Sequence, residues 1–196
     1  MSENKIDNTR RNLIVATGAL GAVAGAAVAV PFVWSFWPSE RAKAAGAPVE
    51  ADISALAPGE LKVVEWRGKP VWIMRRTKEQ LEAVKKADDK VSDPNSEVKL
   101  QPEYAKNEYR SIKPEVLVLV GICSHLGCSP QSKSVEAKGE MGADWGGGFL
   151  CPCHGSKFDL AGRVYKGAPA PVNLDVPPHM YLSDGTILIG EDKKGA

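Results

Sequence analysis

Two short segments hold all four cysteines and two of the three histidines of this chain. The first reads Cys-Ser-His-Leu-Gly-Cys over residues 123–128, and the second reads Cys-Pro-Cys-His-Gly-Ser over residues 151–156. Each segment supplies one Cys and one His at a spacing suited to metal ligands, together with one further Cys. The fold must therefore bring two loops together around a mixed thiolate and imidazole site.

The residue types allow two kinds of metal site. Two Cys and two His can bind tetrahedral zinc, or they can hold a [2Fe–2S] cluster with Cys on one iron and His on the other. Structural zinc sites usually use pairs of like residues at short spacing, whereas each pair here is one Cys and one His. Zinc also leaves the two extra cysteines unexplained. The pattern favours the cluster, with a membrane-tethered zinc-binding interaction module as the alternative.

The two segments resemble the cluster-binding loops of Rieske iron–sulfur proteins of the respiratory type. The resemblance implies one [2Fe–2S] cluster and these roles: Cys123 and Cys151 on the inner iron, His125 and His154 on the outer iron, and a disulfide between Cys128 and Cys153. Rieske ferredoxins and oxygenases generally lack the disulfide pair, so the resemblance is to a high-potential electron acceptor. Such a disulfide persists in the periplasm but not in a reducing cytosol.

Residues around the loops extend the resemblance. Ser156 matches a serine that donates to a bridging sulfide, and Phe158 stands where many members carry a tyrosine whose hydroxyl bonds a ligand sulfur. The missing hydroxyl predicts a reduction potential in the upper half of the range of about −150 to +300 mV, but below that of tyrosine-bearing relatives. Gly167-Ala168-Pro169-Ala170-Pro171 resembles the family's Pro loop, which with Leu126 would cover the cluster. His179 matches no family ligand and is expected to be a surface or structural residue.

The resemblance implies electron transfer in a quinol–cytochrome c oxidoreductase. The chain would take one electron from ubiquinol at the cytochrome b subunit, with proton release, and pass it to the c-type haem subunit. His154 is the expected quinol contact and proton acceptor, with His125 beside it. The expected partners are these two subunits, ubiquinol and membrane lipid in a dimeric complex, and no nucleic acid. The complex is the enzyme, of the translocase class, and the chain alone is inactive. The small Rieske subunit of arsenite oxidase is an alternative.

The N-terminal residues predict export and anchoring. Residues 13–37 carry no charge and are long enough to cross a bilayer as one transmembrane helix. Residues 1–12 are expected to be cytoplasmic, and Thr9-Arg10-Arg11-Asn12-Leu13-Ile14 resembles a twin-arginine signal. Small-residue sites within residues 42–47 allow a cleaved signal peptide instead, but the apolar run is longer than secretory signals usually have. The predicted location is the bacterial inner membrane, with the head in the periplasm.

The rest of the chain predicts a hinge and a head. Residues 38–48 are expected to form a hinge linker, and residues 49–196 an all-β Rieske head of antiparallel sheets with a cluster-binding subdomain at about 119–175. Short β-branched runs and turn residues predict these elements: a hairpin of 61–66 and 70–75, a helix over 77–86, strands at 115–120, 158–159 and 162–165, and a final hairpin over 181–189. Residues 87–113 are expected to be a polar surface excursion, and residues 129–148 an exposed insert.

Overall fold

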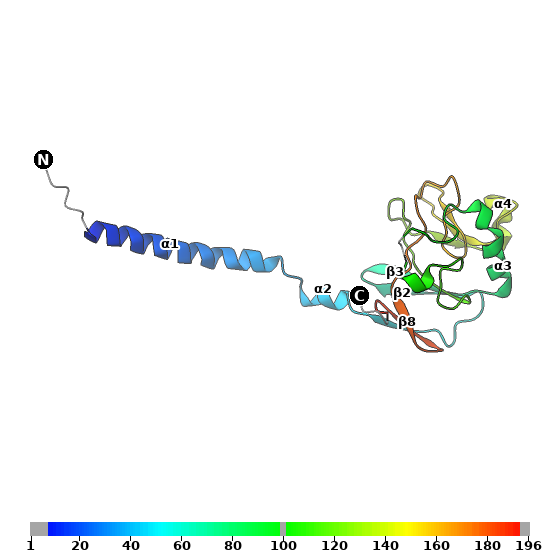
Figure 1. Ribbon diagram of the computed structural model, residues 1–196, viewed down its shortest axis with the longest axis horizontal. Helices are drawn as coiled ribbons and strands as arrows, with labels where there is room; N and C mark the ends of the chain where they lie inside the picture. The colour runs from blue at the N-terminus through cyan, green and yellow to red at the C-terminus, as the bar shows by residue number, and fades with distance from the viewer. Residues whose placement is uncertain (1–7, 99–100, 193–196) are drawn as a thin grey trace. The chain divides into compact units, whose positions relative to one another are not determined.

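The computed structural model describes residues 8–98 and 101–192 (Figure 1). Residues 1–7 of the expected cytoplasmic segment and residues 193–196 of the expected head lie outside the described residues. The chain divides into two compact units, Met1–Ala44 and Ala45–Ala196. The first unit contains the apolar segment, and the second contains every cysteine and histidine.

The first unit contains the helix α1 (Asn8–Ser35), which has 28 residues. It starts earlier than the predicted span of 13–37 and also ends before the last residue of that span. Its most apolar window has a mean hydropathy of 2.2. At 1.5 Å rise per residue the helix is about 42 Å long, which exceeds the roughly 30 Å hydrocarbon core of a bilayer. By length and composition, α1 is a candidate membrane anchor.

The predicted linker is partly helical. The short helix α2 (Glu40–Ala45) lies within residues 38–48. The Ser39 hydroxyl caps its first turn by accepting from the amide of Ala42 at 3.2 Å. A single short turn is marginal in water without packing partners, so this segment has little intrinsic resistance to bending or unwinding.

The head contains three antiparallel sheets of three strands each among its described residues. The strand orders are β1 (Val49–Asp52), β9 (Thr186–Ile189) and β8 (His179–Ser183); β2 (Leu61–Trp66), β3 (Lys69–Arg75) and β4 (Val116–Val120); and β5 (Gln131–Lys133), β6 (Gly148–Leu150) and β7 (Lys157–Phe158). This architecture confirms the all-β head. The predicted strand at 162–165 is reduced to isolated bridges, Phe158 with Val164 and Tyr165 with Val91.

Two tight hairpins form where the sequence predicts them. Arg67 and Gly68 connect β2 to β3 with φ angles of 53° and 69°. Positive φ at both central residues is the geometry that matches the right-handed twist of a two-residue hairpin. The Asp184-Gly185 dipeptide also connects β8 to β9, but without a positive φ at either residue and with a register shift between Tyr181 and Ser183.

Strands β3 and β4 of the middle sheet β2–β3–β4 contribute buried side chains to both faces, because successive side chains of a strand point to opposite sides. One face packs with the two free cysteines and the aromatic residues beside them, and it consists of Trp72, Met74, Leu117 and Leu119. The other face packs on β1 and β9 and consists of Val71, Ile73, Val116 and Val118. Every residue of β4 is buried, so the first cysteine loop follows directly on a rigid core strand.

The helical segments of the head are short: α3 (Lys78–Lys86), α4 (Lys138–Met141), and the 3-10 turns η1 (Asp88–Lys90), η2 (Glu103–Ala105) and η3 (Val135–Ala137). The predicted start of α3 is confirmed. The Thr77 hydroxyl accepts from the amide of Gln80 at 3.3 Å, and the Gln80 side chain accepts from the amide of Thr77 at 2.9 Å. This reciprocal pair is a capping box.

The prediction of a surface excursion at residues 87–113 holds only in part, because several of its described residues are exposed but others are buried in the core. Val91, Ala105 and Arg110 are 0% exposed. The Arg110 guanidinium donates to three backbone carbonyls, those of Leu174, Ala161 and Gly162, at 2.5 to 3.3 Å. Burial lowers the pKa of Arg110 to about 10, so the group stays charged at neutral pH. The polar composition of the segment was misleading about its burial, because a guanidinium such as that of Arg110 has five donors that can satisfy buried carbonyls.

The prediction of an exposed insert at residues 129–148 holds only in part. Trp145 is 3% exposed, its ring lies 5.8 Å from that of Tyr165, and its indole N–H donates to the carbonyl of Ser134 at 2.9 Å. Helix α4 lies beside α3 (Figure 1), with a groove of about 400 Å³ lined by both. A buried indole needs apolar contacts and one hydrogen-bond acceptor, and the insert folds back to supply both.

His179 is structural, one of the two alternatives that the sequence allowed. It is 1% exposed, and its Nδ1 lies 2.8 Å from the carbonyl oxygen of Pro177. Its amide donates to the hydroxyl of Tyr104, which in turn donates to the His179 carbonyl. Burial lowers the pKa of the imidazole, against a smaller opposite effect of the Pro177 hydrogen bond.

Stability of the head is expected to fall as pH drops below about 6.5. In the unfolded chain the histidine takes up a proton near that pH, whereas buried His179 resists protonation. The unfolded state therefore binds more protons than the folded state, and lowering the pH stabilises it relative to the folded state. The effect is at most about 1.4 kcal/mol for each pH unit. Urea unfolding of the full-length chain in detergent at pH 7.5 and 5.5 measures it. His179→Gln should flatten the difference, and an unchanged slope in that variant would contradict the assignment.

Candidate metal centre

The third sheet brings the two Cys/His segments together. The first loop, residues 123–128, lies between β4 and β5, and the second, residues 151–156, joins β6 to β7. Gln131 pairs with Leu150, and Leu150 pairs with Lys157. The sheet therefore holds both ends of the second loop next to the chain that leaves the first.

The two loops close with the same backbone pattern. In each, the amide of the leading Cys donates to the carbonyl five residues later, and its carbonyl accepts from a Gly four residues later. The bonds are Cys123 to Cys128 at 2.7 Å, Gly127 to Cys123 at 3.1 Å, Cys151 to Ser156 at 2.8 Å and Gly155 to Cys151 at 2.9 Å. Both glycines have positive φ, 82° and 74°. The closing turns thus require a residue that tolerates the left-handed region.

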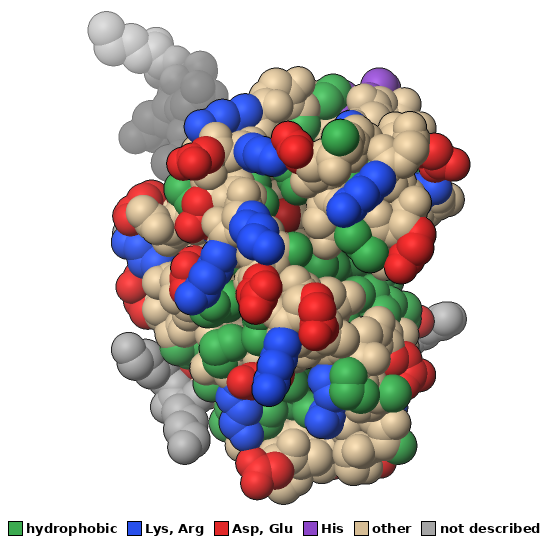
Figure 2. Space-filling view, turned by 90° about the vertical axis from the view of Figure 1, so that its right-hand side faces the viewer, with side chains coloured by type: hydrophobic (Ala, Val, Ile, Leu, Met, Phe, Trp, Pro, Cys, Tyr) green, Lys and Arg blue, Asp and Glu red, His purple; other side chains and the backbone are tan. Residues whose placement is uncertain are grey.

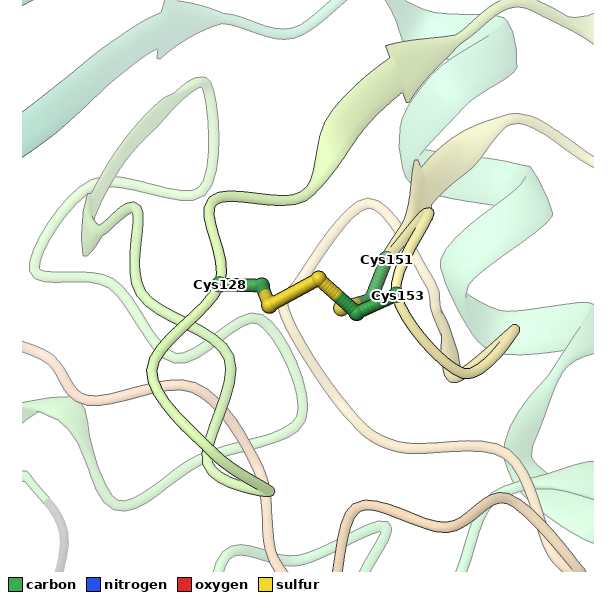
Figure 3. A group of neighbouring side chains, drawn as sticks. All are labelled: Cys128, Cys151 and Cys153. Atoms are coloured by element: carbon green, nitrogen blue, oxygen red, sulfur yellow. A yellow bond between two sulfur atoms is a disulfide. The ribbon is translucent and has the colours of Figure 1, made fainter.

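The predicted disulfide between Cys128 and Cys153 is present, with the two Cα atoms 6.6 Å apart. Figure 3 shows it beside Cys151, and the three sulfur atoms all lie within 4.8 Å of one another. Because the disulfide occupies two of these sulfurs, it removes them from the set of thiolate ligands. The two free thiols that remain are Cys123 and Cys151, both buried.

The environment of Cys123 disfavours a free thiolate. Burial raises the pKa of this thiol, and the neighbouring Cys151 thiol raises it further, while hydrogen bonds from the backbone amide of His125 and from the Ser156 hydroxyl lower it. The net effect raises the pKa of the Cys123 thiol, so this thiol holds its proton at neutral pH. A bound iron would take the place of this proton on Cys123, because the thiolate is the form that binds metal.

The two loop histidines meet ring to ring. Their ring centroids are 4.7 Å apart with an interplanar angle of 84°. His154 is exposed and His125 is half-buried. The Nδ1 atom of His125 is buried and makes no hydrogen bond within the described residues. An unsatisfied buried nitrogen costs about 1 to 3 kcal/mol, and a metal bond at Nδ1 would satisfy it. The donor set therefore fits a mixed Cys and His iron site.

The predicted cover is attached to both loops. The Ser156 hydroxyl is fully buried and accepts from the amide of Ala170 at 3.0 Å. The Ser124 hydroxyl donates to the carbonyl of Val172 at 2.6 Å. Leu126 is 71% exposed, and Pro169 is exposed next to half-buried Ala168. The Pro loop and the residue that follows it are thus hydrogen-bonded to the two cysteine loops, and apolar side chains remain at the surface.

Two supporting features had little sequence signal. Trp72 stacks on Phe149 with ring centroids 4.7 Å apart, and Phe149 pairs with Phe158 across β6 and β7. Buried Asp159 and Arg163 form an ion pair at 2.8 Å just after the second loop. The sequence signal for this ion pair was the i,i+4 spacing of two opposite charges. That spacing usually indicates an exposed pair on a helix, so it did not predict a buried pair.

Charges of both signs are interspersed on the face of the head shown in Figure 2, with apolar side chains between them. The exposed ion pairs belong to this type of surface, for example Lys90 with Asp144 at 2.9 Å and Lys113 with Asp184 at 2.9 Å. Such pairs are typically worth 0.2 to 1 kcal/mol. They contribute little to the energetics of the site.

Comparisons with known proteins agree with this geometry. Residues 101–178 match the model of the Rieske [2Fe-2S] domain, and residues 1–39 match a model described as ubiquitinol-cytochrome c reductase Fe-S subunit TAT signal. The chain is 57% identical to the ubiquinol-cytochrome c reductase iron-sulfur subunit of Allochromatium vinosum, over 100% of this chain and 95% of that protein. It is 44% identical to the subunit of the same name from Blastochloris viridis, over 96% and 97%. A solved hyperthermophilic respiratory Complex III is similar at 30% identity and a TM-score of 0.46, covering 88% of this chain and 97% of that one.

Proposed function

Because this chain belongs to the family of ubiquinol–cytochrome c reductase iron–sulfur subunits, we propose that it carries single electrons from ubiquinol to a c-type haem. It is a subunit of that complex, and its cofactor is one Rieske [2Fe–2S] cluster. Membership of the complex implies a cytochrome b and a cytochrome c1 partner. The full-length 57% identity carries this conclusion, and the paired loop histidines support it.

The family decides between the alternatives that the Cys and His pattern left open. A zinc-binding module and an arsenite oxidase subunit share parts of the loop chemistry. Full-length similarity to quinol-oxidising subunits, together with the signal and domain models, places the chain in the quinol family. The disulfide agrees with this assignment.

We assign the ligands from the donor set. Cys123 and Cys151 hold the inner iron, and His125 and His154 hold the outer iron. Their support is the two buried free thiols and the adjacent imidazoles. When bound, the cluster takes up and releases one electron, and imidazole in place of thiolate raises its reduction potential into the range of about −150 to +300 mV.

The histidines also provide a proton acceptor. His125 keeps Nδ1 buried without a hydrogen-bond partner among the described residues, which leaves Nε2 as the atom able to reach outward. His154 is exposed and is the proposed quinol contact. A neutral imidazole nitrogen can accept the quinol hydroxyl proton as a general base. Ser156 and the Pro loop, Gly167 to Pro171, keep the second loop in place through the Ala170 amide.

The finer organisation is part of the same proposal. Residues 1–12 are cytoplasmic, residues 13–37 form an uncleaved anchor in the inner membrane, residues 38–48 act as a hinge, and residues 49–196 form the periplasmic head with the cluster-binding subdomain at 119–175. The complex is dimeric and in contact with lipid, and the chain alone does not turn over ubiquinol. Helix α1 and the twin-arginine match support the anchor and its direction.

The ligand assignment is tested by three matched histidine substitutions in the full-length chain purified in detergent. His125→Gln and His154→Gln should each lose the cluster absorption and low-temperature EPR signals. His179→Gln should keep both, because His179 belongs to the sheet β1–β9–β8, which carries neither loop, and is buried with its own hydrogen bonds. Retention of the signals in either loop variant, or a colourless wild type with one zinc, would refute the assignment. Copurification with b- and c-type haems tests the partners.

Phe158→Tyr is expected to raise the reduction potential. Phe158 is 0% exposed in the core beside the free cysteines, and a hydroxyl there would donate to a ligand sulfur and favour the reduced cluster. A differential hydrogen bond of about 1.4 kcal/mol corresponds to about 60 mV for one electron. Protein-film voltammetry measures the shift. Phe149→Tyr adds the same hydroxyl to the paired position in β6 and serves as the control, and equal potentials for wild type and Phe158→Tyr would contradict the prediction.

A further inference from the structure

The free thiol of Cys151 lies next to a disulfide. The sulfur atoms of Cys128, Cys151 and Cys153 are mutually within 4.8 Å (Figure 3), and two of them are already bonded. The other free cysteine, Cys123, does not belong to this group of three. Thiol and disulfide at this separation are the two reactants of thiol–disulfide exchange, in which a thiolate attacks one sulfur of an existing bond.

We propose that Cys151 exchanges with the Cys128–Cys153 disulfide whenever iron is absent, so that iron at Cys151 protects the native disulfide. The Cys151 thiolate attacks the Cys128 sulfur, a Cys128–Cys151 bond forms, and the Cys153 sulfur leaves as a thiolate. The proton lost by Cys151 ends on Cys153. No oxidant or reductant is consumed. The inference rests on the proposed function, because it takes Cys151 to be an iron ligand.

The surroundings favour Cys128 as the attacked sulfur. Cys153 is exposed whereas Cys128 is half-buried, and water stabilises the departing thiolate at the exposed position. The new bond joins the same two loops as the native bond. A bond between Cys151 and Cys153 would instead close a three-residue ring across Pro152, whose φ is fixed.

Iron at Cys151 blocks the reaction, because a sulfur bound to metal is no longer the free nucleophile. If oxidation came first, the loops would be joined through a ligand cysteine and the inner iron site would be lost. Iron ligation before oxidation keeps Cys151 out of the exchange. This order agrees with the twin-arginine match over residues 1–39, since that signal suits a domain that receives its cofactor and folds before export.

The test maps disulfides in the full-length chain with and without iron. Iron is removed by a chelator under argon, the protein is held at pH 8.5, quenched in acid and alkylated, and its peptides are analysed by mass spectrometry. A disulfide containing Cys151, with Cys153 newly alkylated, is expected after iron removal. Persistence of Cys128–Cys153 with both Cys123 and Cys151 alkylated overturns the proposal. In a separate sample, the iron-containing chain is alkylated in its native state before the acid quench, and modification of Cys151 there would overturn the ligand set.

Two cluster-free variants separate exchange from general unfolding. Cys123→Ser and Cys151→Ser each remove one inner ligand, but only Cys123→Ser keeps the thiol beside the disulfide. Isolated under the same conditions, Cys123→Ser should lose most of its Cys128–Cys153 bond, whereas Cys151→Ser should retain it. Equal retention in the two variants contradicts the exchange. If neither variant accumulates, the iron-removal experiment on the wild-type chain decides.

Discussion

Arg163→Met is expected to lower the free energy of unfolding of the head by about 3 to 5 kcal/mol, the cost of breaking a buried ion pair from one side. The guanidinium of Arg163 is fully buried and bonds Asp159 at 2.8 Å and Asp88 at 2.6 Å. It also donates to the carbonyls of Val84 and Pro94. The substitution leaves the Asp159 carboxylate buried without its cation.

The loss should reach the metal centre, because Arg163 connects the chain after the second loop to α3 and η1 through Val84 and Asp88. Iron per chain after detergent purification is expected to fall along with the urea midpoint. Lys113→Met is the matched control: it breaks an exposed pair with Asp184 and should change stability by less than about 1 kcal/mol. Adding Asp159→Asn to Arg163→Met should recover part of the loss. Equal midpoints for Arg163→Met and Lys113→Met would contradict the buried-pair argument.

Cys128→Ala combined with Cys153→Ala is expected to cost roughly 3 to 4 kcal/mol of stability. The disulfide closes a sequence separation of 25 residues, and chain entropy predicts a stabilisation of that size for such a loop. The bond is also the covalent link between the two cluster loops, which are otherwise held together by noncovalent contacts such as the hydrogen bonds to Ala170 and Val172 and the His125–His154 ring contact. Faster loss of iron should therefore accompany the lower urea midpoint.

A reductant provides the control for the disulfide prediction. Dithiothreitol should bring the unfolding midpoint of the wild-type chain close to that of the double variant, and it should leave the double variant unchanged. An additional shift of the double variant in reductant would show that the thiol chemistry acts elsewhere. A double variant with wild-type stability and iron retention would contradict the clamp.

The local features of the site were predictable because short-range chemistry dictates them. Four cysteines and two histidines in two segments left few ligand sets, and the family resemblance paired Cys128 with Cys153 as the structure does. The capped start of α3 and the Asp-Gly hairpin depended on a few adjacent residues. Such contacts stay within a few positions along the chain, so the sequence alone contains their signal.

The errors lie where distant segments meet. Residues 87–113 looked like a surface excursion because they are polar, but Arg110 reaches carbonyls 51 to 64 positions away. The insert at 129–148 looked exposed, but Trp145 folds back onto Tyr165. Whether a polar segment is buried depends on the partners that satisfy its hydrogen-bonding groups. Those partners are remote in sequence, so the composition alone does not reveal the burial.

By itself, the sequence predicted the chemistry of this protein: the candidate donor residues, the apolar segment with its export signal, and the all-β head that holds two loops. Only the tertiary structure decided which sulfur lies beside the disulfide, which histidine nitrogen is buried, and which arginines hold the second loop to the rest of the head. The reason is physical. Ligand identity is a property of residue types, whereas a 4.8 Å group of three sulfurs and a buried guanidinium depend on three-dimensional packing.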